Sequence, residues 1–104
     1  MAARISALSK EYVRVQVEAK EAGVLVNPTT LVVKMAFVPD SARQPVSSDW
    51  QTASWETEPG PLYFARIVVG PGGFVLAPAT YTVWVQITDT PEIPARPAGP
   101  LVVF

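Results

Sequence analysis

Apolar and polar residues alternate along much of the chain, and a period of two predicts β-strands. In the stretch YVRVQVEA, residues 12–19, Val13, Val15 and Val17 share one parity and polar residues occupy the other. The stretch TYTVWVQIT, residues 80–88, shows the same alternation. This pattern is typical of antiparallel strands that bury one face and expose the other.

The remaining strand candidates are short and are flanked by turn residues such as Asn-Pro and Gly-Pro-Gly-Gly. They are LVVKMAFV at 31–38, DWQTASWE at 49–56, LYFARIVV at 62–69 and LVVF at 101–104, with ISAL at 5–8 as an edge strand. Six or seven short strands at this spacing predict an all-β, antiparallel two-sheet sandwich. We expect one domain over residues 1–104, with a short N-terminal edge segment at 1–10.

The stretch LAPATYTV, residues 76–83, resembles the L-x-P-G-x-Y-x-V stretch of immunoglobulin-like and fibronectin type III domains. In those domains a tyrosine hydroxyl bonds to the upstream backbone and forms the tyrosine corner. The resemblance implies that Tyr81 has this role in a sandwich of about seven short strands, although Ala79 stands where glycine is commoner. The alternative is an ordinary aromatic residue at the start of a strand.

Prolines recur every three residues near the end of the chain, at Pro91, Pro94, Pro97 and Pro100. The string P-x-x-P-x-R, completed by Arg96, matches a ligand pattern of proline-binding domains, but so short a string is common by chance. We favour a structural role. An extended, proline-stiffened crossing over residues 89–100 would lead to the closing strand and seat it. A docking arm on a neighbouring subunit is a variant of this hypothesis.

The charge content is low and balanced. Charged residues make up 16% of the chain, below the roughly 25% that is usual in soluble proteins, and the net charge is −1. The basic residues are spread singly, which argues against a nucleic-acid partner. No apolar run approaches the length of a membrane span or a signal peptide, so we expect a soluble protein made in a cytoplasm. A surface poor in charge suggests that a partner covers part of it.

Catalytic chemistry has few candidate residues. Cysteine and histidine are absent, which excludes zinc sites of sulfur and imidazole and triads with a cysteine nucleophile or a histidine base. The glycines at 70–73 lack the G-x-G-x-x-G pattern and predict a turn. The carboxylates considered for acid–base work are Asp40, Asp49, Glu56, Glu58, Asp89 and Glu92, which we interpret as solvated loop groups. We therefore expect no enzyme activity, no metal and no cofactor.

The predicted interface consists of apolar residues on faces or edges that would otherwise meet solvent. Its candidates are Trp84, Leu62, Phe64, Val68, Leu101 and Val103. Strand 62–69 is apolar on both faces apart from Arg66, and such a strand is usually covered. The cover is either a loop of the same domain or a permanent contact with another subunit.

Four stretches together resemble small immunoglobulin-like virion structural proteins of tailed bacteriophages, especially those of actinobacteria. They are LSKEYVRVQVEA, SSDWQTASWE, ARIVVGPGG and YTVWVQITDTPEIPARPAGPLVV. The resemblance implies a non-enzymatic capsid accessory, decoration or minor capsid subunit; a head–tail connector (neck) or tail component is the alternative. It implies protein–protein interaction with major capsid or neck subunits, in a homo-oligomer or a symmetric assembly. The protein would reside in the virion after synthesis in the host cytoplasm.

A more distant alternative is a carbohydrate- or surface-binding immunoglobulin-like module. Trp50 and Trp55 would then serve as stacking platforms for sugar rings, near the carboxylates of Asp49 and Glu56. An enzyme that acts through these carboxylates is the weakest hypothesis.

Overall fold

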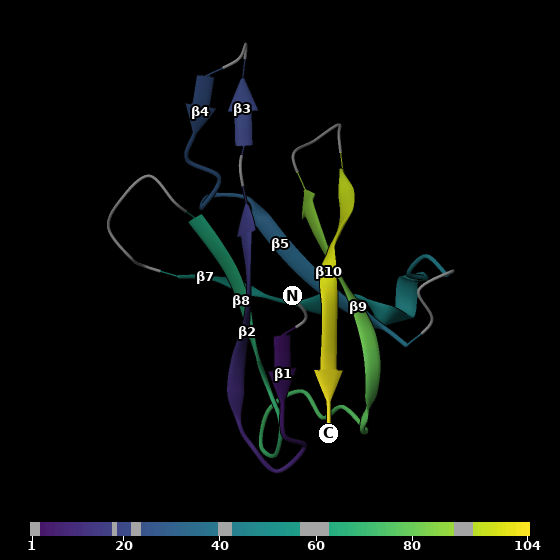
Figure 1. The fold of residues 1–104 in the computed structure, drawn as a ribbon. Helices are drawn as coiled ribbons and strands as arrows, with labels where there is room; N and C mark the ends of the chain where they lie inside the picture. Colours follow the sequence, from purple (N-terminus) through teal and green to yellow (C-terminus); the bar gives the residue numbers. More distant parts are fainter. Residues whose placement is uncertain (1–2, 18, 22–23, 40–42, 57–62, 89–92) are drawn as a thin grey trace.

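The computed structural model describes residues 3–17, 19–21, 24–39, 43–56, 63–88 and 93–104. These residues form a mostly β fold with one short 3-10 helix, η1 (Ser47–Asp49) (Figure 1). The strands are β1 (Ala3–Ile5), β2 (Glu11–Val17), β3 (Ala19–Glu21), β4 (Val24–Val26), β5 (Val32–Val38), β6 (Gln51–Thr52), β7 (Ser54–Trp55), β8 (Tyr63–Val69), β9 (Ala79–Thr88) and β10 (Ala95–Val103).

The strands belong to three sheets. The large sheet has the order β1-β10-β9-β5-β6, the small sheet has the order β2-β8-β7, and β3 pairs with β4 in a separate hairpin. All pairings are antiparallel except that of β1 with β10, so the large sheet is mixed. The sequence predicted the main strands but missed the β3–β4 hairpin and the parallel pairing.

One hydrophobic core joins the inner faces of the large and small sheets. Its buried members come from both sheets and are Ile5, Val13, Val15, Val33, Met35, Phe37, Ala65, Val69, Tyr81, Val83, Leu101 and Val103. The inner residues of β2, β5 and β9 alternate in sequence, as the period-two pattern predicted. This arrangement is compatible with an all-β sandwich whose core is held by apolar packing.

The chain crosses between the two main sheets at Ala53. Residues Gln51–Thr52 pair with β5 in the large sheet, whereas Ser54–Trp55 pair with β8 in the small sheet. Ala53 donates its N–H to the carbonyl of Val33 at 3.1 Å, which ties the crossing to β5. The predicted single strand over 49–56 is therefore two short strands.

The predicted hydrogen bond of the tyrosine corner is confirmed. The hydroxyl of Tyr81 donates to the backbone carbonyl of Ala77 at 2.6 Å, and the Tyr81 ring is buried in the core. The bond fixes the backbone just before β9, where the chain enters the large sheet. Ala79 at the commoner glycine position does not prevent it.

The predicted crossing over residues 89–100 is wrong for its second half. Residues from Ala95 onward already belong to β10, which runs antiparallel to β9 in the same sheet (Figure 1). Pro94 lies just before that strand, and its carbonyl accepts a hydrogen bond from the N–H of Ile87 at 3.1 Å. Pro91 lies outside the described residues.

Pro97 and Pro100 lie within β10, and strand pairing explains why they are tolerated. Because the Pro94 carbonyl accepts from Ile87, the backbone polar groups of residues 94 and 96 point toward β9. The Phe104 N–H donates to Ile5 on the other side, so the backbone polar groups of residues 101 and 103 also point toward β9. The nitrogens of Pro97 and Pro100 therefore point away from β9. On that side, the described residues give β10 no strand neighbour before Leu101. These two prolines therefore protect an open edge within β10, whereas the prediction placed them in a crossing before the closing strand.

Candidate functional site

A cluster of arginine and aromatic side chains lies on the outer face of the small sheet. It consists of Tyr12 and Arg14 on β2, Phe64 and Arg66 on β8, and Glu56 just after β7; we call it the Arg–aromatic cluster. Side chains alternate along a strand, so Tyr12 and Arg14 point to the other face of the sheet from the buried Val13 and Val15. Phe64 and Arg66 likewise point to the other face from the buried Ala65.

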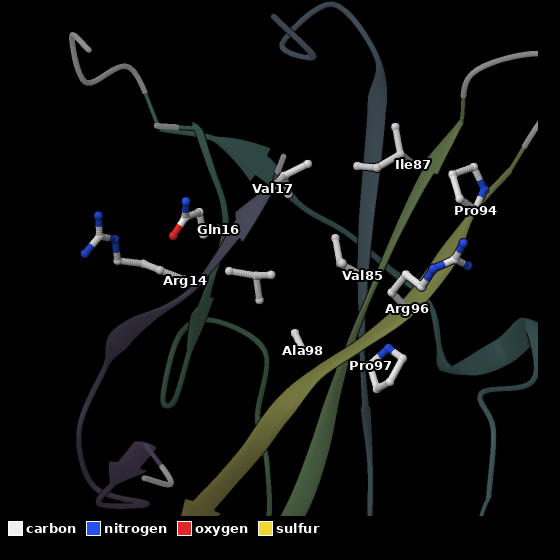
Figure 2. Close-up of a pocket in the computed structure, with 10 residues that line it drawn as sticks. Arg14, Gln16, Val17, Val85, Ile87, Pro94, Arg96, Pro97 and Ala98 are labelled. Carbon is white, nitrogen blue, oxygen red and sulfur yellow. The ribbon is translucent and has the colours of Figure 1, made fainter. Parts of the chain in front are cut away.

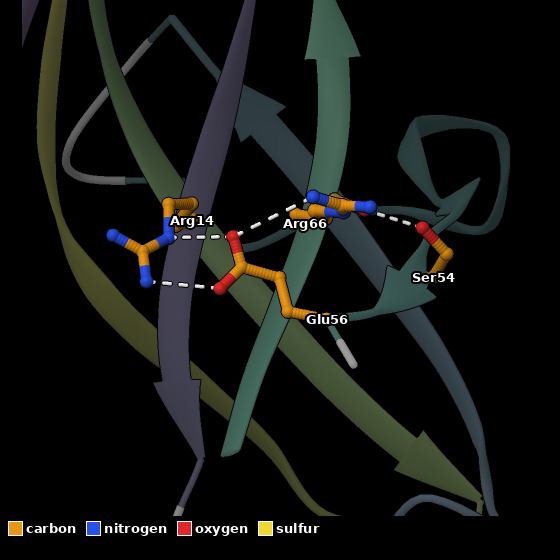
Figure 3. Close-up of polar contacts among 4 residues, drawn as sticks. All are labelled: Arg14, Ser54, Glu56 and Arg66. Carbon is orange, nitrogen blue, oxygen red and sulfur yellow. Dashed lines mark hydrogen bonds and ion pairs between the residues drawn. The ribbon is translucent and has the colours of Figure 1, made fainter. Parts of the chain in front are cut away.

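Glu56 links the two strands of the cluster. Its carboxylate accepts a bidentate pair of hydrogen bonds from Arg14, at 2.6 Å from Nε and 2.9 Å from Nη2. The same carboxylate lies 3.8 Å from Nη1 of Arg66, so it sits between the two guanidinium groups (Figure 3). Backbone pairing holds it there, because the Glu56 N–H donates to the carbonyl of Phe64 at 2.9 Å.

Each arginine of the cluster also covers an aromatic ring. The guanidinium carbon of Arg14 lies 4.2 Å from the ring centroid of Phe64, and that of Arg66 lies 4.1 Å from the ring centroid of Tyr12. Both are diagonal cross-strand contacts, because the strand register pairs Arg14 with Arg66. Cation–π contacts of this kind contribute about 0.5–1 kcal/mol each at exposed sites.

The charges of the cluster are unbalanced. Arg14 and Arg66 lie directly opposite each other across the strands, which is unfavourable for like charges. Glu56, whose side chain is 6% exposed, offsets that repulsion but supplies only one negative charge. Nε of Arg66 is buried and has no hydrogen-bond acceptor in the described part of the chain. The described residues of this face therefore combine arginine and aromatic side chains, a composition that suits binding to protein surfaces.

We expect Glu56→Gln to lower the free energy of unfolding by about 1–3 kcal/mol, because it removes a negative charge that lies between two opposed arginines. The effect stays below that of a fully buried pair, since the side chains of Arg14 and Arg66 are 45% and 32% exposed. Urea unfolding followed by circular dichroism measures the change. The control is Glu11→Gln, an exposed position on β2, the strand that carries Arg14. It should shift the free energy of unfolding by less than about 0.5 kcal/mol. Equal stability of the two variants would contradict a bridging role.

No protein-family model, no curated protein and no solved structure matches this chain. Among the described residues, no helix is long and apolar enough to cross a membrane.

The structure places the predicted interface residues in different environments. Phe64 and Val68 are half-buried on the outer face of the small sheet, where Arg14 covers the Phe64 ring and Val68 lies opposite Tyr12. Leu62 lies outside the described residues. Part of the cover predicted for strand 62–69 thus comes from arginines of the same chain.

Leu101 and Val103 do not form an exposed edge, and this prediction is wrong. Their side chains are buried in the core, at 0% and 3% exposure. Their strand, β10, is covered over residues 101–103 by β1, which pairs with it in parallel. The sequence pattern could not reveal this cover, because β1 is only three residues long.

Trp84 lies on the outer face of the large sheet, as its parity predicted. The register places it between Ala36 of β5 and Pro97 of β10, and the residue is half-buried. Its indole Nε1 is buried and has no hydrogen-bond partner among the residues that the structure describes. Ala36 and Val38, on the same face of β5, are fully buried, unlike the half-buried Trp84, and η1 contacts that strand. Much of this face is therefore covered from within the chain.

The candidate carboxylates do not converge in the described part of the chain. Glu56 is buried against Arg14, so its interpretation as a solvated loop group is wrong. Asp49 accepts hydrogen bonds from Arg43 at 2.8 Å and from the Val46 N–H at 2.8 Å, and these hold the pKa of its carboxyl below the usual range. Asp40, Glu58, Asp89 and Glu92 lie outside the described residues. No group of potential metal ligands occurs within the described segments.

The two tryptophans proposed as a sugar platform do not act together. Trp55 packs against the core, and its indole Nε1 donates to the carbonyl of Leu31 at 3.0 Å. Trp50 follows η1, on the other side of the crossing at Ala53.

The Arg–aromatic cluster is the site that sequence reasoning missed. In the sequence pattern Arg66 is an interruption of an apolar face, and Glu56 is a loop carboxylate. The parity of Tyr12, Arg14 and Gln16 on β2 was a usable signal for one half of the cluster. The pairing of β2 with β8 supplied the other half, and that pairing is not local in sequence.

Proposed function

We propose that this protein is a non-enzymatic structural subunit of a tailed-bacteriophage virion, held to neighbouring virion proteins by the Arg–aromatic cluster. The observation that carries the docking role is the pairing of Arg14 with Phe64 and of Arg66 with Tyr12 around the carboxylate of Glu56. Arginine and tyrosine are enriched among the residues that dominate protein interfaces. The virion context comes from the sequence resemblance.

The proposed fold is an immunoglobulin-like or fibronectin type III-like sandwich. The bond from the Tyr81 hydroxyl to Ala77 supports this assignment, and so does a core shared by two sheets. In such a fold the sheet faces and the end loops remain available for contacts with other proteins. A subunit repeated in a symmetric shell requires surfaces of this kind.

Within the virion we favour a capsid accessory or decoration subunit that contacts the major capsid protein. A head–tail connector or a tail component is the alternative position. Mass spectrometry of purified particles tests the virion role directly, and absence of the protein from particles would contradict it. Hundreds of copies per particle would indicate shell decoration, whereas about a dozen would indicate a connector ring.

The docking surface has its own test. Tyr12 is 52% exposed, so Tyr12→Ala should weaken incorporation into particles with little loss of stability. Val75→Ala is the matched control, because Val75 is even more exposed, at 72%, but lies in the segment between β8 and β9, outside the cluster. Normal incorporation of the Tyr12 variant would rule out the cluster as the docking surface while leaving the virion role standing.

A further inference from the structure

The sandwich is open along one side, between β2 of the small sheet and β10 of the large sheet. A groove of about 510 Å³ lies there, within the roughly 300–1,000 Å³ typical of ligand sites. Figure 2 shows its two walls, β2 on one side and β9 with β10 on the other. A smaller cavity of about 190 Å³ shares Val15 and Ala98 with it and continues along the same two strands.

The floor of the groove is apolar. Val15 and Val17 of β2 and Val85 and Ile87 of β9 line it, and all four have the parity of the core-facing residues. Val17, Val85 and Ile87 are only partly buried although they pack against the core. Apolar side chains inserted from outside would complete their burial.

One wall of the groove is an edge strand with backbone groups available for pairing. β2 ends the small sheet, whose order is β2-β8-β7. The carbonyls of Phe64 and Val68 accept hydrogen bonds from the N–H groups of Glu56 and Phe74. The backbone polar groups of the even-numbered residues of β8 therefore point away from β2. Odd-numbered residues of β8 therefore bond to odd-numbered residues of β2, and the backbone of Gln16 points outward at the groove.

The opposite wall is closed to strand pairing. The nitrogens of Pro97 and Pro100 point to the open edge of β10, and proline has no N–H to donate. Proline on an edge is a known protection against strand addition. A strand entering the groove would therefore pair with β2 and contact β10 through side chains alone.

Arg96 is a basic group of the groove for which the described residues supply no acidic partner. Arg96 pairs with Val85 across β10 and β9, so its side chain is on the same face of the sheet as that of Val85, and both residues line the groove. Its Nη1 donates to the carbonyl of Ala95 at 3.0 Å, and no carboxylate in the described segments pairs with it. A carboxylate on an inserted segment would balance the charge of the Arg96 guanidinium group and accept hydrogen bonds from it.

We propose that β2 binds an extended segment of a partner protein as an added β-strand. The segment has apolar side chains at alternate positions, which enter the groove over Val85 and Ile87, and one carboxylate that binds Arg96. Backbone bonds to β2 supply affinity, and the alternating side chains supply specificity. A second copy pairing through its own β2 fits less well, because antiparallel pairing centred on Arg14 would oppose like charges.

Nuclear magnetic resonance titration of the purified full chain tests this proposal. The probe is a synthetic peptide of about seven residues, with threonine at odd positions and valine, aspartate and valine at the even ones. We expect the Gln16 amide to shift and to become protected from hydrogen exchange. A peptide with asparagine in place of aspartate should bind about tenfold more weakly. Absence of any shift at Gln16 with the aspartate peptide would overturn the proposal.

Three variants extend this test. Gln16→Pro removes the outward N–H of β2 and should abolish binding, whereas Gln16→Ala keeps that N–H and should bind like the parent chain. Arg96→Gln should bind the aspartate and asparagine peptides equally, and it is a second test if the proline variant fails to fold. Unchanged binding by a folded Gln16→Pro, or an undiminished aspartate preference in Arg96→Gln, would contradict the proposal.

If the chain self-associates and Gln16→Pro abolishes that self-association, the occupant of the groove is a second copy. This result would overturn the assignment to a partner protein. This inference does not depend on the virion role. The peptide titration uses purified protein, whereas the particle analysis uses assembled virions, so each can fail alone.

Discussion

Leu101→Ala is expected to lower the free energy of unfolding by about 3–5 kcal/mol, the largest effect of any single side-chain truncation considered. Leu101 is 0% exposed and is among the largest fully buried side chains. It lies in β10, paired with Tyr81 of β9 on one side and with Ala3 of β1 on the other. Strands on both sides limit how far the backbone can move to fill the cavity.

The measurement is chemical unfolding with Leu8→Ala as the matched control. Leu8 is 90% exposed, so the same truncation there should change stability by less than about 0.5 kcal/mol. The comparison also separates two roles for the end of the chain. Little loss of stability in the Leu101 variant, together with loss of a partner contact, would restore the original prediction of an exposed terminal interface.

Gly70→Ala is the second large effect, expected at about 2–4 kcal/mol. Gly70 has φ of +120°, a conformation that residues with a Cβ rarely adopt. A Cβ at this position would overlap the carbonyl oxygen of Ser9 and lie 2.9 Å from its carbonyl carbon. Both atoms belong to the backbone, so no side-chain rotation relieves the clash.

Gly99→Ala separates the two contributions. Gly99 has a similar φ of +130°, but a Cβ there would have open space within 4 Å. We expect about 1 kcal/mol from backbone strain alone. Thermal unfolding of the two variants side by side measures the difference, which is the cost of the contact with Ser9. Equal destabilisation would mean that the segment 6–10 moves away from Gly70 at little cost.

The contact between Gly70 and Ser9 matters for the architecture as well. Gly70 follows β8, whereas Ser9 precedes β2, and these two strands form most of the small sheet. The turn at 70–73 is closed by a bond from the Gly73 N–H to the Gly70 carbonyl at 2.9 Å. The glycine run thus forms the predicted turn, and it also permits the close approach of two segments.

The two proposed contact surfaces lie on different parts of β2. The side chains of Tyr12 and Arg14 belong to the Arg–aromatic cluster on the outer face, whereas Val15 and Val17 line the groove on the inner side. An edge strand can serve both, because successive side chains point to opposite faces. The two sets of variants therefore test separate contacts on one strand.

Local pattern predicted much of the fold and little of the site. The parities of β2, β5 and β9 separated core residues from outer ones, and LAPATYTV located the bond from Tyr81 to Ala77. The proline run was assigned to a crossing because period-three prolines favour an extended chain, which is equally compatible with an edge strand. Only the pairing of Pro97 with Trp84 and of Pro100 with Thr82 distinguishes the two.

The sequence by itself determined where β2, β5, β8 and β9 lie and which of their faces is buried, since both follow from the alternation of side chains along a local stretch. The tertiary structure alone decided which strands are neighbours. That choice brought Glu56 to Arg14, 42 residues away, covered Leu101 with β1 and left the edge of β2 open beside Arg96. Such contacts arise when distant strands share one core, and no period within a single strand encodes which strand will lie beside it.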